Sequence, residues 1–144
     1  VGMHDTVKIL NQRFGCDMNP EKVVTDQEAY FFNNIERVKP YDPVINFAKQ
    51  CKANGKPISV ASGGVKKTVI ATMNAVGITE IFETIVTQDD VKNSKPSPDL
   101  FLLAAEKMRV DPTKCLVFED SKLGIEAANN AGMKSVLVQP DDPQ

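Results

Sequence analysis

The chain has 144 residues, of which 42% are apolar and 25% are charged, and its formal net charge is −2. This length and composition are typical of one folded domain and exclude a disordered or collagen-like chain. The slight acidic excess argues against a general binder of phosphate backbones, so we expect no nucleic-acid partner. The longest unbroken apolar run, Leu100–Ala105, is far shorter than the roughly 18–20 residues that cross a bilayer. We therefore expect no membrane segment.

The cysteines and the chain start bear on location and completeness. Cys16, Cys51 and Cys115 lie too far apart for a metal or redox motif, so we expect them to be reduced and packed, as in a cytoplasmic protein. No charged region followed by an apolar region opens the chain, so nothing signals secretion. The chain begins Val-Gly-Met rather than with Met. We therefore expect the sequence to be a piece of a longer one.

Residues 1–39 predict helices only. The first helix ends at Gly15, and the second begins at Asn19-Pro20, which supply an N-cap and a first-turn proline. The second helix is predicted to continue to Val38. The apolar positions that define the two helical faces are Val7, Leu10, Phe14, Val24, Phe31, Ile35 and Val38. Two short amphipathic helices cannot bury their apolar faces alone, so we expect this part to pack on something else.

From residue 40 onward, helix and strand patterns alternate. The predicted helices span 43–54, 65–76, 98–108 and 122–131, and the predicted strands span 57–61, 84–87, 115–119 and 134–138. Strands that are apolar on both faces and separated by helices indicate a parallel sheet covered on both sides. We therefore predict an α/β, doubly wound fold with a helical appendage at its N-terminus. Ligands of such folds bind beyond the carboxyl ends of the strands, which are followed here by 62–64, 88–90 and 120–121.

The turn Ser62-Gly63-Gly64 joins the strand 57–61 to the helix 65–76. Backbone N–H groups and the positive end of the helix dipole would face an anion placed there, and the Ser62 hydroxyl adds a donor. The turn therefore predicts a phosphate site. Taken alone, a helix N-cap followed by flexible glycines is the more ordinary explanation.

The pair Glu119-Asp120 ends the strand 115–119. Two adjacent carboxylates at a strand end suit Mg²⁺, which is held by one or two carboxylates together with phosphate and water. The alternative is that Asp120 or Ser121 caps the following helix while Glu119 is solvated. Capping and metal binding do not exclude each other.

Lys95 precedes a stiff segment, Pro96-Ser97-Pro98, at the start of the helix 98–108. A lysine held before a helix at this edge of the sheet would neutralise phosphate charge. The alternative is an ordinary solvated lysine in a loop. The small residues of the helix 122–131, which begin with Gly124, predict close packing of that helix against the sheet.

Taken in order, three strings closely resemble the haloacid-dehalogenase superfamily of phosphohydrolases over essentially the whole chain. They are the Ser-Gly turn, the Lys-Pro-Ser-Pro-Asp loop at 95–99, and Phe-Glu-Asp-Ser with the Gly-Ile and Ala-Ala that follow it at 118–128. The nearest resemblance is to the β-phosphoglucomutase and sugar-phosphate phosphatase branch. It implies a Rossmann-like core at 40–144, a partial helical cap at 1–39 and a small sugar phosphate as substrate.

The resemblance also implies a role for each polar motif. Ser62 would bind the transferring phosphoryl group with the help of the Gly63 amide, and Lys95 would bridge the phosphate and the nucleophile. Ser62 and Lys95 are therefore the expected catalytic residues of this chain. Glu119 and Asp120 would hold Mg²⁺.

One motif of that superfamily has no counterpart here. The string Asp-x-Asp-Gly-Thr, which supplies the nucleophilic aspartate on the central strand, does not occur, and the pairs Asp89-Asp90 and Asp141-Asp142 lack its context. Without a nucleophile, covalent catalysis has no first step, so we expect this chain alone to be inactive. The strands ending at Ser62 and Asp120 should also lie about 9.6 Å apart, two strand spacings, unless they close up or another segment fills the gap.

Two classes of function follow. The leading hypothesis is a Mg²⁺-dependent phosphatase or phosphomutase that transfers a phosphoryl group to an aspartate absent from this chain. The rival is a non-catalytic, truncated relative that binds a phosphate or a protein partner. An open strand position would invite strand donation by a partner or the formation of a homodimer. A receiver-like or nucleotide-binding domain is disfavoured because no Gly-x-Gly-x-x-Gly or Walker lysine occurs.

Overall fold

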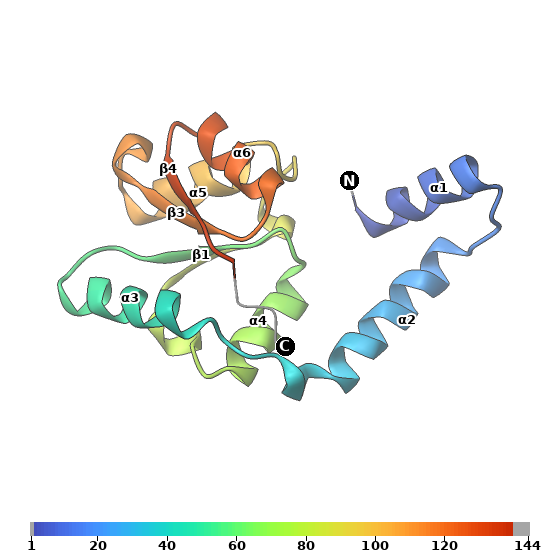
Figure 1. Cartoon of the computed structure of the whole chain (residues 1–144), viewed down its shortest axis with the longest axis horizontal. Helices are drawn as coiled ribbons and strands as arrows, with labels where there is room; N and C mark the ends of the chain where they lie inside the picture. The colour runs from blue at the N-terminus through green and yellow to red at the C-terminus, as the bar shows by residue number, and fades with distance from the viewer. Residues whose placement is uncertain (1, 140–144) are drawn as a thin grey trace. The chain divides into compact units, whose positions relative to one another are not determined.

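The computed structural model describes residues 2–139. The chain divides into two compact units, residues 1–38 and 39–144, and Figure 1 labels most of their elements. The α-helices are α1 (Met3–Phe14), α2 (Pro20–Asn33), α3 (Asp42–Ala53), α4 (Lys66–Ala75), α5 (Asp99–Met108) and α6 (Lys122–Asn130). The strands are β1 (Ser59–Ala61), β2 (Thr84–Val86), β3 (Leu116–Glu119) and β4 (Lys134–Leu137). The predicted order of helices and strands is confirmed.

The first unit is a pair of helices, α1 and α2, in contact with each other. The helix α1 ends at Gly15, whose φ of 65° is a left-handed conformation that glycine adopts without strain. The side chain of Asn11 then fixes the connection, because it donates to Met18 O at 2.8 Å and accepts from Met18 N at 3.0 Å. The chain turns between the helices because this one amide pairs with both backbone groups of Met18.

The second helix is shorter than predicted. The sequence predicts one helix to Val38, but α2 ends at Asn33 and a separate 3₁₀ turn, Ile35–Arg37, follows. Asn34 causes the break, because its side chain donates to Tyr30 O at 2.8 Å and its amide donates to Phe31 O at 3.1 Å. Asparagine competes with the helix in this way because its short side chain reaches nearby backbone groups.

The strands of the second unit form two small parallel sheets, and the break falls between β1 and β3, the two strands that the sequence predicts to lie on either side of the missing one. In one, β1 pairs with β2 in the register Ala61↔Val86, and in the other β3 pairs with β4 in the register Phe118↔Val136. Among the described residues, no strand pairs with the remaining edge of β1 or of β3. The two sheets are separate because, within residues 2–139, no strand is hydrogen-bonded to both β1 and β3.

Helix α5 joins the two sheets through its buried face. Leu100 and Ala104 pack with Val86 of β2 in one apolar cluster, whereas other α5 side chains pack with β3 and α6 in a second. Ala61 of β1 packs against both clusters. The second cluster consists of Phe101, Ala105, Val117, Ala127, Ala128, Ala131 and Met133. Within this unit, α5 and α6 cover one side of the strands and α3 and α4 the other (Figure 1).

Two expectations about the whole chain can be compared with the described residues. None of their helices is long and apolar enough to cross a bilayer. The three cysteines are free thiols, but the expectation that all are packed is wrong for Cys16, which is exposed. Cys16 follows the end of α1, and its thiol donates a long hydrogen bond to Phe14 O, at 3.9 Å.

Candidate active site

A cavity of about 440 Å³ lies at the carboxyl ends of β1 and β3. Every polar residue that the sequence singles out for the site lines it: Ser62, Gly63, Lys95, Glu119 and Asp120. The rest of the lining is mostly apolar and consists of Tyr41, Val44, Ala61, Phe118 and Val138. The structure thus brings together three segments that are distant in sequence, as the rule on strand ends leads one to expect.

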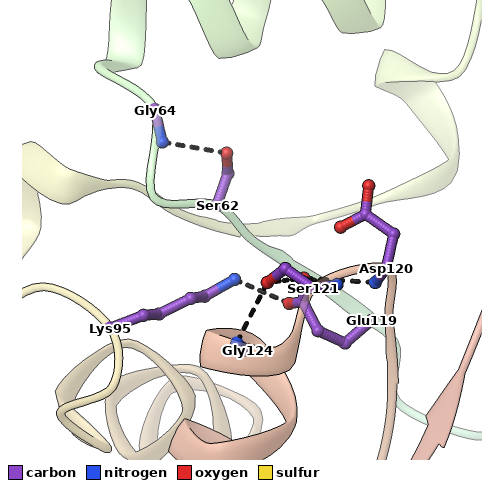
Figure 2. Close-up of polar contacts among 7 residues, drawn as sticks. All are labelled: Ser62, Gly64, Lys95, Glu119, Asp120, Ser121 and Gly124. Carbon is purple, nitrogen blue, oxygen red and sulfur yellow. Dashed lines mark hydrogen bonds and ion pairs between the residues drawn. The ribbon is translucent and has the colours of Figure 1, made fainter.

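The turn after β1 presents hydrogen-bond donors to this cavity. The amide of Ser62 continues the ladder by donating to Val86 O at 2.9 Å, and its Oγ accepts from Gly64 N at 3.1 Å (Figure 2). Among the described residues, no acceptor pairs with the Ser62 hydroxyl proton or with the Gly63 amide. A Cβ at Gly63 would meet nothing within 4 Å, so the backbone there is open to a ligand. Both donors can therefore serve an anion.

The start of α4 differs from the sequence prediction. The helix begins at Lys66, and the amide of Lys66 donates to the Asp89 carboxylate at 2.7 Å. The first amide of α4 is therefore taken by a carboxylate of this chain rather than left for a phosphate. Sequence reasoning missed this role of Asp89, because the partner lies 23 residues away and no local pattern connects the two.

Lys95 is paired rather than solvated. Its Nζ lies 2.7 Å from Glu119 Oε2 and 5.0 Å from the ring centroid of Phe101, and the Lys95 and Glu119 side chains are 16% and 9% exposed. Such burial is tolerated because the two charges compensate each other. The alternative interpretations, a solvated Lys95 and a solvated Glu119, are therefore both wrong.

The loop that carries Lys95 is fixed by Asp99 at the start of α5. One Asp99 oxygen accepts from both the backbone and the side chain of Asn93, and the other accepts from Ser97 Oγ at 2.8 Å. The hydrogen bonds from Ser97 and Asn93 lower the pKa of Asp99 below its ordinary value. The Lys95 backbone is thus held between two residues that share one carboxylate.

The second oxygen of Glu119 is also occupied. Oε1 accepts from Asp120 N at 3.2 Å, from Ser121 N at 3.3 Å and from Ser121 Oγ at 3.1 Å. Burial acts to raise the pKa of Glu119, but its hydrogen bond and ion pair with Lys95 outweigh burial and hold the pKa below its ordinary value. The hydrogen bond with Glu119, together with burial, raises the pKa of Asp120.

The beginning of α6 is built around the Glu119 side chain. Ser121 is the N-cap, because its Oγ accepts from Gly124 N at 3.0 Å, which decides between the two predicted caps. A Cβ at Gly124 would overlap the Glu119 side chain. Gly124 was expected to bring the helix close to the sheet, but its specific role is to leave room for this carboxylate.

The carboxylates of Glu119 and Asp120 differ in how accessible they are to a metal ion. Figure 2 shows the Asp120 carboxylate directed away from the Lys95–Glu119 pair. Within residues 2–139, no group of three or more histidine, cysteine, aspartate or glutamate side chains is placed to hold a metal ion. Asp120 therefore fits Mg²⁺ as one accessible ligand, whereas Glu119 is engaged by Lys95, and this chain alone provides an incomplete ligand set.

Comparison with protein families defines the class of protein. The family model described as haloacid dehalogenase-like hydrolase matches residues 1–138, so the chain belongs to this family. The resemblance inferred from the three motifs is thereby confirmed.

Individual relatives point in the same direction. The chain is 37% identical to YhcW of Bacillus subtilis (strain 168) over 90% of its length and 59% of that protein. It is 36% identical to the fructose-1-phosphate phosphatase YqaB of Escherichia coli (strain K12) over 90% of its length and 67% of that protein. The chain therefore spans about three fifths to two thirds of these relatives.

Solved structures share the fold. The CbbY protein of Rhodobacter sphaeroides, in complex with phosphate, superposes with a TM-score of 0.82 at 22% identity, covering 94% of this chain and 64% of that one. The β-phosphoglucomutase of Clostridium difficile gives a TM-score of 0.77 at 23% identity, covering 97% and 66%. The Rossmann-like α/β fold predicted from the sequence is confirmed by these likenesses.

Proposed function

We propose that this chain forms most of a phosphatase or phosphomutase that acts on a small sugar phosphate. The observation that carries the proposal is the convergence of Ser62, Gly63 and Lys95 on one cavity at the carboxyl ends of β1 and β3. Two relatives named for phosphorylated sugars support the substrate class: the fructose-1-phosphate phosphatase YqaB and the phosphorylated carbohydrates phosphatase of Thermotoga maritima.

The roles follow from the available donors and charges. The Ser62 hydroxyl and the Gly63 amide would donate to two oxygens of the phosphoryl group, since neither donor has an acceptor among the described residues. Lys95 would contribute positive charge from the opposite wall of the cavity. Donors fixed in place before the ligand arrives stabilise transferred negative charge without reorganisation. Residues 1–39 would serve as a partial cap over such a core.

We also propose Mg²⁺ as the cofactor, with Asp120 and Glu119 as its ligands from this chain. The ion would neutralise phosphoryl charge during transfer. Asp120 is accessible to the ion, whereas Glu119 would have to share an oxygen with Lys95 or release it. The remaining ligands and the nucleophilic aspartate would come from another segment.

The free edges of β1 and β3 suggest where that segment binds. Both strands end at the cavity, and neither edge has a strand partner among the described residues. A strand inserted there would join the two small sheets into one and would place its carboxyl end beside Lys95. The segment would belong to the same polypeptide, or a second copy would donate it and create a dimer. The free thiols of the described cysteines are in keeping with a cytoplasmic location.

The second candidate is a non-catalytic phosphate-binding protein. It is favoured by the fact that the described lining of the cavity contains no carboxylate other than Glu119 and Asp120. Both candidates predict phosphate binding, but only the first predicts turnover when the missing motif is supplied.

The decisive experiment measures hydrolysis of p-nitrophenyl phosphate with Mg²⁺ by the 144-residue chain and by a fusion that carries an Asp-x-Asp-Gly-Thr strand before residue 1. We expect no turnover by the chain alone and turnover by the fusion that is lost in Lys95→Ala and in Asp120→Ala. Lys92→Ala is the matched control, because Lys92 is exposed in the same loop and does not line the cavity. Turnover that is indifferent to Lys95 and Asp120 would contradict the proposal.

A further inference from the structure

The end of β2 and the turn that follows it are hydrogen-bonded to the phosphate-site turn at every second residue. Val86 O accepts from Ser62 N at 2.9 Å, and Gln88 N donates to Gly64 O at 3.1 Å. The Asp89 carboxylate accepts from Lys66 N at 2.7 Å. Residue 62 is thus bonded to the end of β2, residues 64 and 66 are bonded to the turn that follows it, and Gly63 is bonded to neither.

This alternation determines which groups face the cavity. On the bonded side there is no spare room at Gly64, because a Cβ there would lie 3.2 Å from Val69 Cγ2 and 3.4 Å from Ser62 Oγ. On the other side Gly63 is open and lines the cavity. Bonds to residues 62, 64 and 66 therefore hold the backbone on both sides of Gly63, whose own amide has no acceptor among the described residues.

Among these three contacts, only the one from Asp89 depends on a side chain. Asp89 lies on the 3₁₀ turn Gln88–Asp90, which is fixed in turn by Asp90 and the buried Thr87. The Asp90 carboxylate accepts from Thr87 N at 2.8 Å and from Thr87 Oγ1 at 3.2 Å. The Asp89 carboxylate is thus carried to the start of α4 by a turn that is anchored in the core.

We propose that Asp89 is a positioning residue for the phosphate-binding turn. The hydrogen bond from Lys66 N to Asp89 fixes the end of this turn that leads into α4. The hydrogen bond from Ser62 N to Val86 O, which continues the β1–β2 ladder, fixes the end that follows β1. Asp89 does not line the cavity, so it would act on a bound phosphate only through the turn. The expected effect of Asp89 on phosphate affinity rests on the proposed function, whereas its expected effect on the conformation of the turn does not.

Three variants separate positioning from plain charge or plain stability. Asp89→Ala removes the acceptor, and Asp89→Asn keeps an acceptor oxygen while removing the charge. Asp111→Ala is the matched control, because Asp111 caps the 3₁₀ turn Pro112–Lys114 through Thr113 N at 2.8 Å and does not line the cavity. All three are studied in the full 144-residue chain with inorganic phosphate as the probe.

Two readouts are recorded by ¹H–¹⁵N spectroscopy: the Gly63 and Gly64 amide resonances without ligand, and their shifts during a phosphate titration. We expect Asp89→Ala to displace or broaden both resonances and to weaken phosphate binding by about two- to tenfold, the range expected for loss of an ordinary cap. Asp89→Asn should stay within about twofold of the parent, since asparagine caps as well as aspartate. Asp111→Ala should change neither readout.

The outcomes distinguish this inference from the proposed function. Unchanged resonances and affinity in Asp89→Ala would overturn the inference, as would an equal loss in Asp111→Ala. Tighter phosphate binding by both Asp89 variants would also overturn it, because it would show that the carboxylate acts by repulsion. If the parent chain binds no phosphate, the proposed function fails, and the ligand-free resonances still decide whether Asp89 positions the turn.

Discussion

The two walls of the cavity differ in how far their polar groups are already satisfied. On the β1 wall, the Ser62 hydroxyl and the Gly63 amide have no described acceptor, although the surrounding backbone is held by the turn after β2. On the β3 wall, Lys95 and Glu119 are paired with each other, and both Glu119 oxygens accept hydrogen bonds. The β1 wall therefore offers unpaired donors to an anion, whereas the charged groups of the β3 wall are already paired with each other.

This difference has a physical consequence for ligand binding. A phosphate that binds at the β1 wall displaces only water from the Ser62 hydroxyl and the Gly63 amide, and no hydrogen bond within the protein has to break. A ligand that needs Lys95 must compete with a carboxylate 2.7 Å away in a poorly exposed site. The β3 wall is therefore the one where adding or removing a single charge should have the larger effect.

The largest expected effect comes from breaking the Lys95–Glu119 pair. Glu119→Gln leaves the Lys95 ammonium without its counter-charge, and we expect the free energy of unfolding to fall by about 2–3 kcal/mol. A double-mutant cycle with Lys95→Met, measured by urea unfolding followed by circular dichroism, should give a coupling of about 1–3 kcal/mol.

The chain contains a matched control for this cycle. Lys22 and Asp26 form an i,i+4 ion pair whose side chains are 72% and 63% exposed. The cycle Lys22→Met with Asp26→Asn should give only about 0.3–0.5 kcal/mol. Equal coupling energies for the two pairs would show that burial does not strengthen the Lys95–Glu119 ion pair. The proposed difference between the β1 and β3 walls would then be wrong.

A smaller effect is expected from Gly124, which leaves space for the Glu119 side chain. Gly124→Ala should cost about 1–3 kcal/mol, because the new methyl group forces Glu119 out of its place. In a Glu119→Ala background the same change should be neutral or stabilising, since alanine favours a helix by about 1 kcal/mol over glycine. Thermal unfolding of the four proteins tests this change of sign.

Gly63→Ala is the control for the glycine experiment. A Cβ there meets nothing within 4 Å, so we expect a change in unfolding free energy of less than about 0.5 kcal/mol. A cost at Gly124 that persists without the Glu119 side chain would place the clash elsewhere.

The helices and strands could be predicted from the sequence because neighbouring residues determine where each of them begins and ends. Gly15 ends the first predicted helix, Gly77 and Gly132 directly follow the predicted helices 65–76 and 122–131, and each of the three has a positive φ. The convergence of the site was also predictable, since parallel strands share one carboxyl edge. These rules need only residue type, spacing and the alternation of helix and strand.

The pairings across the site could not be predicted in the same way. Lys95 and Glu119 are 24 residues apart, and Lys66 and Asp89 are 23 apart. Lysine and acidic residues are ordinary at any surface, and topology alone decides which of them meet. The division into two sheets, by contrast, agrees with the gap between β1 and β3 that the absence of the Asp-x-Asp-Gly-Thr strand predicts.

The pH dependence of stability gives a third test of the β3 wall. Burial raises the pKa of Glu119, but Lys95 outweighs it, so the pKa in the folded protein lies below the ordinary 4.5. A carboxyl group whose pKa is lowered by folding contributes stability above its unfolded pKa and loses it as the pH falls through its folded pKa. The difference in unfolding free energy between the parent and Glu119→Gln should therefore reach its full size by about pH 6 and become smaller below pH 4.5. Urea midpoints at a series of pH values measure it, and a constant difference would contradict the ion pair.

The smallest expected effect concerns the support of the Lys95 loop from outside the cavity. Asn130, at the end of α6, donates from Nδ2 to Pro96 O at 3.0 Å, next to Lys95 in the chain. Because this hydrogen bond is exposed, Asn130→Ala should lower the free energy of unfolding by only about 0.5 kcal/mol. Asn129→Ala is the neighbouring control. If the β3 wall is held mainly by its internal ion pair, the Lys95–Glu119 coupling should be unchanged in the Asn130→Ala background. A coupling that falls by half or more would show instead that α6 and the loop hold the pair in place.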